Sequence, residues 1–145
     1  MSARHSPFTC FSAGLLAVFS GLHATPPALG QTLAGTHWQI AEIDGQRLEG
    51  AERRKTSLRL DDTASRFAAS AGCNRIMGGY KLDGGQIRFG AAAMTRMACP
   101  GLAGEREKAF VAALAKVRAV EVTSGMMTLS DGNGVPLIRL FAAQK

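Results

Sequence analysis

Residues 72–100, GCNRIMGGYKLDGGQIRFGAAAMTRMACP, contain the features from which we predict the fold. The centre of this stretch predicts a two-stranded β-hairpin. Residues 78–82 form one strand, the Asp-Gly-Gly sequence at 83–85 forms the turn, and residues 86–89 form the returning strand. Asp and Gly tolerate the positive φ angles that tight hairpin turns require. We therefore place a hairpin at the centre of the domain.

Short strand patterns lie on both sides of this hairpin. Apolar and polar residues alternate, or short apolar runs end at turn residues, in segments 36–43, 46–48, 57–60, 66–71, 120–123, 126–129 and 137–141. Asp44-Gly45 and Ser124-Gly125 predict tight turns between neighbouring strands. The polar segment 49–56 is predicted to be a loop, and residues 90–98 show no clean period.

A single convincing helix is predicted at residues 102–117, after the chain-breaking Pro100-Gly101. Phe110, Leu114 and Val117 recur at helical spacing and form one apolar stripe. Such a stripe must be covered, and the rest of the chain offers a sheet. We predict an α+β fold in which about seven or eight short strands form an antiparallel, barrel-like sheet with one helix packed against it.

The N-terminal 30 residues predict a secretory signal peptide. Arg4 precedes an apolar and small-residue run at 7–22, which is short for a membrane-spanning helix and is followed by Pro26-Pro27. Cleavage after Ala24 or after Gly30 fits this pattern, and Ala28-Leu29-Gly30 matches the small-x-small rule better. We expect removal of residues 1–30, which would take Cys10 away and leave a domain at residues 31–145 in the periplasm or outside the cell. An uncleaved membrane anchor is the alternative; after cleavage we expect no stable membrane insertion.

The charge pattern does not favour nucleic-acid binding. The whole chain has 17 Lys and Arg against 11 Asp and Glu, a net charge of +6, and loss of Arg4 with the signal peptide reduces it to +5. The basic residues are scattered, and one Trp and one Tyr offer little stacking surface for bases. We expect a monomer that does not bind nucleic acid.

Two cysteines, Cys73 and Cys99, remain after removal of residues 1–30. In an oxidising compartment, pairing is the default state of two such cysteines. A disulfide between them would close the predicted hairpin at its base and would stabilise the fold by roughly 3–4 kcal/mol in the chain-entropy model.

The chain resembles the META domain family, also called HslJ-like after its bacterial heat-shock member. The matching features are Trp38, the Ala-Gly-Cys-Asn-Arg sequence at 71–75, Gly79-Tyr80, the Met-Thr-Arg-Met-Ala-Cys sequence at 94–99, the helix at 105–114 and the strands at 129–141. The resemblance covers nearly the whole chain after the signal peptide. It implies a small envelope-associated domain that is linked to stress tolerance, antibiotic resistance or secretion and has no established catalytic site.

The residues themselves indicate no catalytic site. His37 is the one histidine after residue 30, and its place beside Trp38 in a predicted strand is that of an ordinary strand histidine. His37, Cys73 and Cys99 lack zinc-site spacing, and the glycine pairs lack a phosphate-loop pattern. We predict no enzyme activity and no cofactor.

A soft-metal site is an alternative hypothesis. Cys73 with Met77, and Met94 with Met97 and Cys99, offer thiolate and thioether ligands of the kind that Cu(I) prefers. A disulfide would remove both thiolates, and methionine is also a common filler of hydrophobic cores.

Four polar residues next to the cysteines form a candidate site. Asn74 and Arg75 follow Cys73, and Thr95 and Arg96 lie across the hairpin from them. They are predicted to form either a binding patch or, as we favour, a hydrogen-bond network between two loops. On the network hypothesis, replacement of Arg96 by Ala destabilises the domain.

We expect an exported, non-enzymatic META domain protein that supports envelope stress tolerance by binding an envelope protein or another envelope component. One alternative is a periplasmic copper or redox protein. Another is a small inhibitor of an envelope hydrolase, for which the chain shows no recognisable inhibitory loop.

Overall fold

A computed structural model describes residues 33–143. The predicted signal peptide therefore lies outside the described residues. Nine strands are present in this range: β1 (Trp38–Ile43), β2 (Gln46–Arg47), β3 (Thr56–Asp61), β4 (Arg66–Ala71), β5 (Arg75–Asp83), β6 (Gln86–Met94), β7 (Ala119–Thr123), β8 (Met126–Ser130) and β9 (Pro136–Ala142). Two helices accompany them, α2 (Gly50–Arg54) and α3 (Leu102–Lys116).

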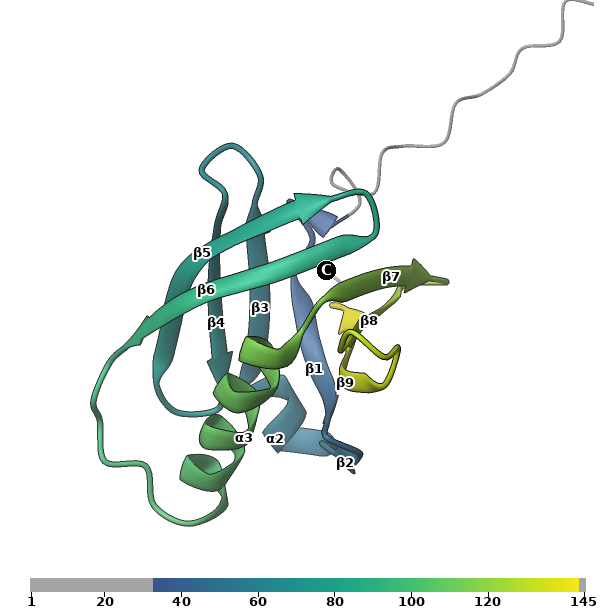
Figure 1. The fold of residues 1–145 in the computed structure, drawn as a ribbon. Coiled ribbons are helices and arrows are strands. Elements are labelled where there is room, and N and C mark those ends of the chain that lie inside the picture. The colour runs from purple at the N-terminus through teal and green to yellow at the C-terminus, as the bar shows by residue number, and fades with distance from the viewer. Residues whose placement is uncertain (1–32, 144–145) are drawn as a thin grey trace, which may run out of the picture.

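The strands form one closed antiparallel sheet. Their order is β2-β1-β3-β4-β5-β6-β7-β8-β9, and pairing of β1 with β9 closes the ring. The long β5–β6 hairpin crosses the front of the barrel, and α3 lies below it (Figure 1). These findings confirm the predicted α+β, barrel-like fold.

The turns follow the local sequence signals. Asp44 and Gly45 both have positive φ angles, as do Ser124 and Gly125, which is the geometry of the tight hairpin turns predicted at these pairs. In the central hairpin, Gly84 supplies the positive φ angle between β5 and β6. The two strands of this hairpin are longer than predicted, since β6 continues through the small residues up to Met94.

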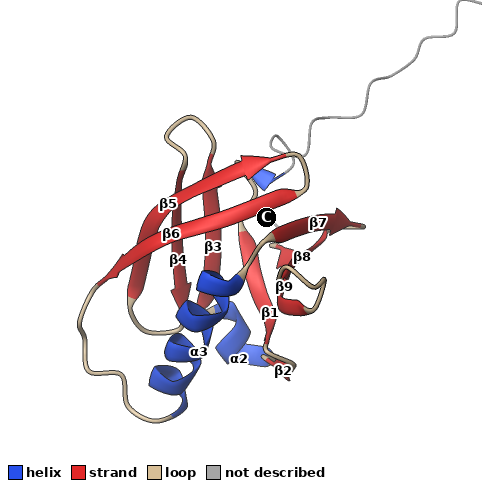
Figure 2. Cartoon of the chain, viewed as in Figure 1, coloured by secondary structure: helices blue, strands red, loops and turns tan. Residues whose placement is uncertain are grey.

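The prediction that residues 49–56 form a loop is wrong. This segment contains α2, followed by the first residue of β3, so the domain has a second, short helix in addition to the one predicted (Figure 2). None of the residues of α2 is buried, and the segment therefore lacks the apolar stripe that marks a helix in sequence. Glu52 connects α2 to α3, because its carboxylate lies 2.9 Å from a guanidinium nitrogen of Arg106.

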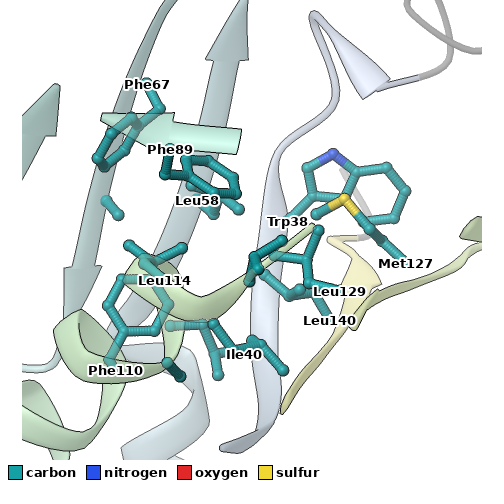
Figure 3. Close-up of a cluster of buried hydrophobic side chains, with 14 of the residues drawn as sticks. Trp38, Ile40, Leu58, Phe67, Phe89, Phe110, Leu114, Met127, Leu129 and Leu140 are labelled. Carbon is teal, nitrogen blue, oxygen red and sulfur yellow. The ribbon is translucent and has the colours of Figure 1, made fainter. Parts of the chain in front are cut away.

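The hydrophobic core fills the barrel and continues onto α3. Trp38, Ile40 and Phe110 are completely or almost completely buried, and Figure 3 shows side chains of the strands and of α3 converging on one interior. The ring planes of Phe67 and Phe89 are nearly perpendicular, with centroids 5.1 Å apart. The predicted stripe of α3 is buried along its length, including Val117 just past its end. The helix thus closes one end of the barrel and positions the loops that lead into it.

Candidate functional site

The predicted polar residues lie where the β4–β5 turn meets the segment that follows β6. Asn74 is the centre of this region and is 4% exposed. Its side-chain oxygen accepts hydrogen bonds from the Thr95 hydroxyl at 2.9 Å and from the Met97 N–H at 2.8 Å. The Thr95 hydroxyl in turn accepts the N–H of Arg75 at 3.0 Å. One asparagine side chain therefore links two loops that are more than 20 residues apart in sequence.

Glu107 of α3 completes the arrangement from the third side. One carboxylate oxygen accepts the backbone N–H of Asn74 at 2.7 Å, and the other accepts its side-chain amide at 2.8 Å. Glu107 is 6% exposed, and hydrogen bonds from N–H groups are what make burial of a carboxylate tolerable. We call Asn74, Thr95 and Glu107, with the backbone N–H groups that they bind, the Asn74 network.

A disulfide between Cys73 and Cys99 joins the same two loops, with the two Cα atoms 6.0 Å apart. The side-chain amide of Asn74 lies 3.0 Å from the sulfur of Cys99. The disulfide and the Asn74 network are therefore adjacent, and both join the β4–β5 turn to the segment that follows β6. This arrangement makes a rigid floor at the end of the barrel.

The side chains of the two arginines in the predicted site, Arg75 and Arg96, are not part of the Asn74 network. Arg75 enters the network through its backbone: its N–H donates to the Thr95 hydroxyl at 3.0 Å, and its carbonyl accepts the N–H of Thr95 at 3.1 Å. Arg96 is exposed, and within residues 33–143 its side chain makes no hydrogen bond or ion pair. The geometry therefore does not support a stabilising role for Arg96.

Glu107 is not among the site residues that the sequence predicts. It lies three residues before Phe110 and seven before Leu114, so it occupies the buried stripe of α3. A carboxylate at a stripe position was the available signal, because a buried acid needs partners.

A cleft of about 620 Å³ opens beside the Asn74 network. Its floor includes Asn74 and Glu107, and its rim carries Met94, Met97 and Leu102. These three apolar side chains are 39%, 59% and 73% exposed. We call this the methionine cleft. It combines a rigid polar floor with an exposed and flexible apolar rim.

Of the five proposed copper ligands, Met94, Met97 and Cys99 line one cleft, whereas Met77 lines another. Both sulfurs of the cysteines are in the disulfide. Met94 pairs directly with the buried Ile76, whereas Met77 is the next residue along β5 and projects from the opposite face of the sheet. Within residues 33–143, no group of three or more His, Cys, Asp or Glu residues is placed to hold a metal ion.

His37 lies just before β1 and lines a different cleft together with Arg59. Partial burial lowers the pKa of this imidazole, and the positive charge of Arg59 lowers it further. The neutral ring is therefore favoured at neutral pH. Its backbone carbonyl accepts the N–H of Ala143, which ties it to the end of β9.

The described part of the chain contains no helix that is long and apolar enough to cross a membrane.

The fold is a closed antiparallel barrel with a helix across one end, and a disulfide and a buried hydrogen-bond network join its loops there. A model of the META domain matches residues 31–144. The chain belongs to the META domain family.

Solved structures share this fold. The chain is similar to a protein from Burkholderia xenovorans whose structure was determined by NMR, with 25% identity, a TM-score of 0.63, and coverage of 90% of this chain and 100% of the other. It is also similar to a DUF4847 family protein from Bacteroides vulgatus, known from a crystal structure, with 12% identity, a TM-score of 0.58, and coverage of 81% and 99%. The latter likeness concerns the fold alone. A comparison with curated protein sequences gives no match.

Proposed function

We propose that this META domain protein is exported, has no enzyme activity, and supports the cell envelope under stress by binding a segment of another envelope protein in the methionine cleft. The observation that carries the proposal is the concentration of exposed apolar side chains at this cleft. Met94, Met97 and Leu102 border it, and each is among the large hydrophobic residues that are exposed in the described chain. Grouped exposed apolar residues are typical of protein interaction sites.

The chemistry of the cleft favours an apolar protein segment as its occupant. Methionine side chains are flexible and polarizable, so they adapt to the shape of a partner. Lys108 and Glu105 lie at the edge of the same cleft and offer charges of both signs to a partner backbone or side chain. The disulfide and the Asn74 network hold the floor in place, which lowers the entropy lost on binding.

Export is supported by the N-terminal sequence pattern and by the disulfide, which is typical of proteins in oxidising compartments. An intact mass of the protein purified from its own compartment tests this part of the proposal. A mass that corresponds to loss of residues 1–30 and to two cysteines that resist alkylation is the expected result.

The binding proposal is tested by placing a photo-crosslinking amino acid at position 97 and exposing the protein to envelope extract. We expect crosslinking to a discrete partner, which is then identified and purified. Its affinity is measured for the wild type and for Met97→Glu, which places a charge on the apolar rim and should weaken binding.

Met77 provides a matched control. It is a methionine of 40% exposure on the outer face of the barrel, and it lines a different cleft. Met77→Glu should bind the partner as the wild type does. Equal loss of affinity in both variants, or the same crosslinks from positions 77 and 97, would contradict the proposal.

A further inference from the structure

A second cleft, of about 500 Å³, lies between α2 and the outer side of β1, β8 and β9. Three arginines line it: Arg47 of β2, Arg53 of α2 and Arg139 of β9. We call it the arginine cleft. It is independent of the methionine cleft and shares no lining residue with it.

Arg53 carries the inference. Its Nε is buried, and among the residues that the structure describes no acceptor bonds to it. A buried N–H of a guanidinium without an acceptor is unfavourable, and such groups are rare in folded proteins. The guanidinium of Arg53 therefore has donor capacity that no described residue uses, and Arg53 lines the cleft, where an anion can approach this group.

The backbone that carries Arg53 is held in place by Thr56, whose side chain is buried. The Thr56 hydroxyl donates to the carbonyl of Arg53 at 2.7 Å and accepts the N–H of Ile40 at 3.0 Å. β1 and β3 are paired only at Trp38 and Leu58, and the Ile40 N–H, further along β1, bonds to the Thr56 side chain. The last turn of α2 is thus fastened to β1, and the position of Arg53 follows from that attachment.

The other charges of the cleft do not neutralise Arg53. Glu42 lies between Arg139 and Arg47 in the sheet register and forms ion pairs with both. Glu49 is an exposed residue at the beginning of α2 and forms no ion pair within residues 33–143. Three guanidinium groups against two carboxylates leave the lining with a net positive charge.

One side of the arginine cleft is apolar. Leu48 is buried there, Met126 is half-buried, and Phe141 is 44% exposed. Met126 and Phe141 face each other directly across β8 and β9, so they present one continuous apolar surface. A ligand that satisfies both sides of the cleft carries an anionic group and an apolar group.

We propose that the arginine cleft binds a small amphiphilic acid, with a carboxylate or phosphate group received by Arg53 and a short apolar chain packed on Phe141. Guanidinium groups hold both types of oxyanion through charge-assisted hydrogen bonds. The volume of the cleft is that of a small-molecule site.

The test is an isothermal titration of the purified domain with four probes: hexanoate, hexyl phosphate, inorganic phosphate and hexanol. We expect saturable binding of hexanoate, hexyl phosphate or both, weaker binding of inorganic phosphate, and no binding of hexanol. Tighter binding of one of the two amphiphilic acids identifies the headgroup. If hexanol binds as well as the acids do, or if neither acid binds, the proposal is wrong.

Two variants assign the site. Arg53→Gln should weaken binding of the preferred acid by about tenfold or more, because the charge and its donors are lost. Glu49→Gln should strengthen binding, since it removes a competing carboxylate without touching the arginines. The second variant keeps the test decisive if Arg53→Gln fails to fold.

Arg88 on β6 is the matched control, because it is an exposed arginine outside the cleft. Arg88→Gln should leave the affinity unchanged. Equal weakening by Arg53→Gln and Arg88→Gln would show general charge attraction and would overturn the assignment. Met97→Glu should also leave binding of the acid unchanged, which separates this proposal from the protein-binding function.

Discussion

At the scale of single residues, Glu107 shows how a buried carboxylate is accommodated without an ion pair within the described chain. Both of its oxygens accept N–H groups of one residue, Asn74, and that residue uses its own oxygen to hold the neighbouring loop. The charge is thereby compensated by hydrogen bonds alone. Asn74 and Glu107 are mutually dependent, since loss of either leaves buried polar groups of the other without partners.

Replacement of Glu107 by Ala should lower the free energy of unfolding by about 2–4 kcal/mol, because two N–H groups of Asn74 lose their acceptors. Urea denaturation measures this difference. Glu105→Ala is the control, since Glu105 lies on the same helix but is exposed, and we expect a much smaller change. Similar losses in the two variants would mean that the helix dipole, not the network, accounts for the effect.

His37 should titrate with a pKa below 6.5, as measured by NMR of its ring protons. Burial is the main cause and the charge of Arg59 the second, so Arg59→Gln should raise the pKa of His37 without restoring it fully. Arg88→Gln should leave it unchanged.

The direction of the resulting pH dependence follows from the lowered pKa. The unfolded chain binds a proton at His37 more readily than the folded domain does. The contribution of His37 to stability is therefore complete above pH 6.5 and decreases as the pH falls through 6.5 toward the folded-state pKa. This decrease should be absent in His37→Gln. A stability that rises as the pH falls through this range would contradict the assignment.

At the scale of elements, β5 depends on a close approach at Gly78. A Cβ atom at this position would lie 2.6 Å from a ring carbon of Phe67 and 2.9 Å from the carbonyl oxygen of Ala91. The strand can therefore lie between β4 and β6 only with glycine at this site. Gly79, the next residue, has its nearest neighbour at 3.7 Å, in ordinary contact.

We expect Gly78→Ala to lower the free energy of unfolding by about 2 kcal/mol or more, because Phe67 and the strand backbone must shift. Gly79→Ala should change it by well under half as much. Thermal unfolding of the two variants measures the contrast. Equal stability of the two variants would show that β5 adjusts freely, which the surrounding packing does not suggest.

The two loops joined by Cys73 and Cys99 depend on the disulfide as well as on hydrogen bonds. The bond spans 26 residues of sequence, and a double change of both cysteines to Ser should cost roughly 3–4 kcal/mol in the chain-entropy model. Urea denaturation of the wild type with a reducing agent should give the same loss. If the reduced protein is as stable as the oxidised one, the Asn74 network alone holds the loops.

The prediction of individual elements from sequence succeeded where local signals act alone. The central hairpin has its turn at the Asp-Gly-Gly sequence, and α3 ends one residue before the predicted boundary at Val117. The signals failed for α2, which lacks a buried stripe, and for the outer part of β6, where alanines show no alternation. In these segments the surrounding sheet decides the structure, and local sequence does not report it.

At the scale of the whole molecule, the predicted barrel-like sheet is confirmed. The strand pair that closes the ring, and the clefts on its surface, could not be predicted from the sequence. Pairing of β1 with β9 joins residues about 100 positions apart, and no local pattern specifies such a pair. The same is true of the arginine cleft, which Arg53 and Phe141 both line because the ring closes. The network could be anticipated in part, since Asn74 and Thr95 flank the predicted hairpin.

Neighbouring strands of the ring differ in how many residues they pair, and hydrogen exchange of the backbone amides should show this difference. β6 and β7 are paired at a single position, Gln86 with Ala119, whereas β8 and β9 are paired along their length. We expect the amides of Ile87 and Val120, which bond across the β6–β7 seam, to exchange faster than the bonded amides between β8 and β9. Uniform protection around the ring would contradict this expectation.

The closure of the ring also has a consequence for protein engineering. Trp38 pairs with Ala142, and the carbonyl of His37 accepts the N–H of Ala143 at 2.7 Å, so the segment that leads into β1 lies beside the end of β9. A linker that keeps the buried Leu33 can join these two segments, and the exposed Ser124-Gly125 turn offers a place for new ends. The domain is thus suited to circular permutation, and equally to insertion as a cassette into a surface loop of a host protein.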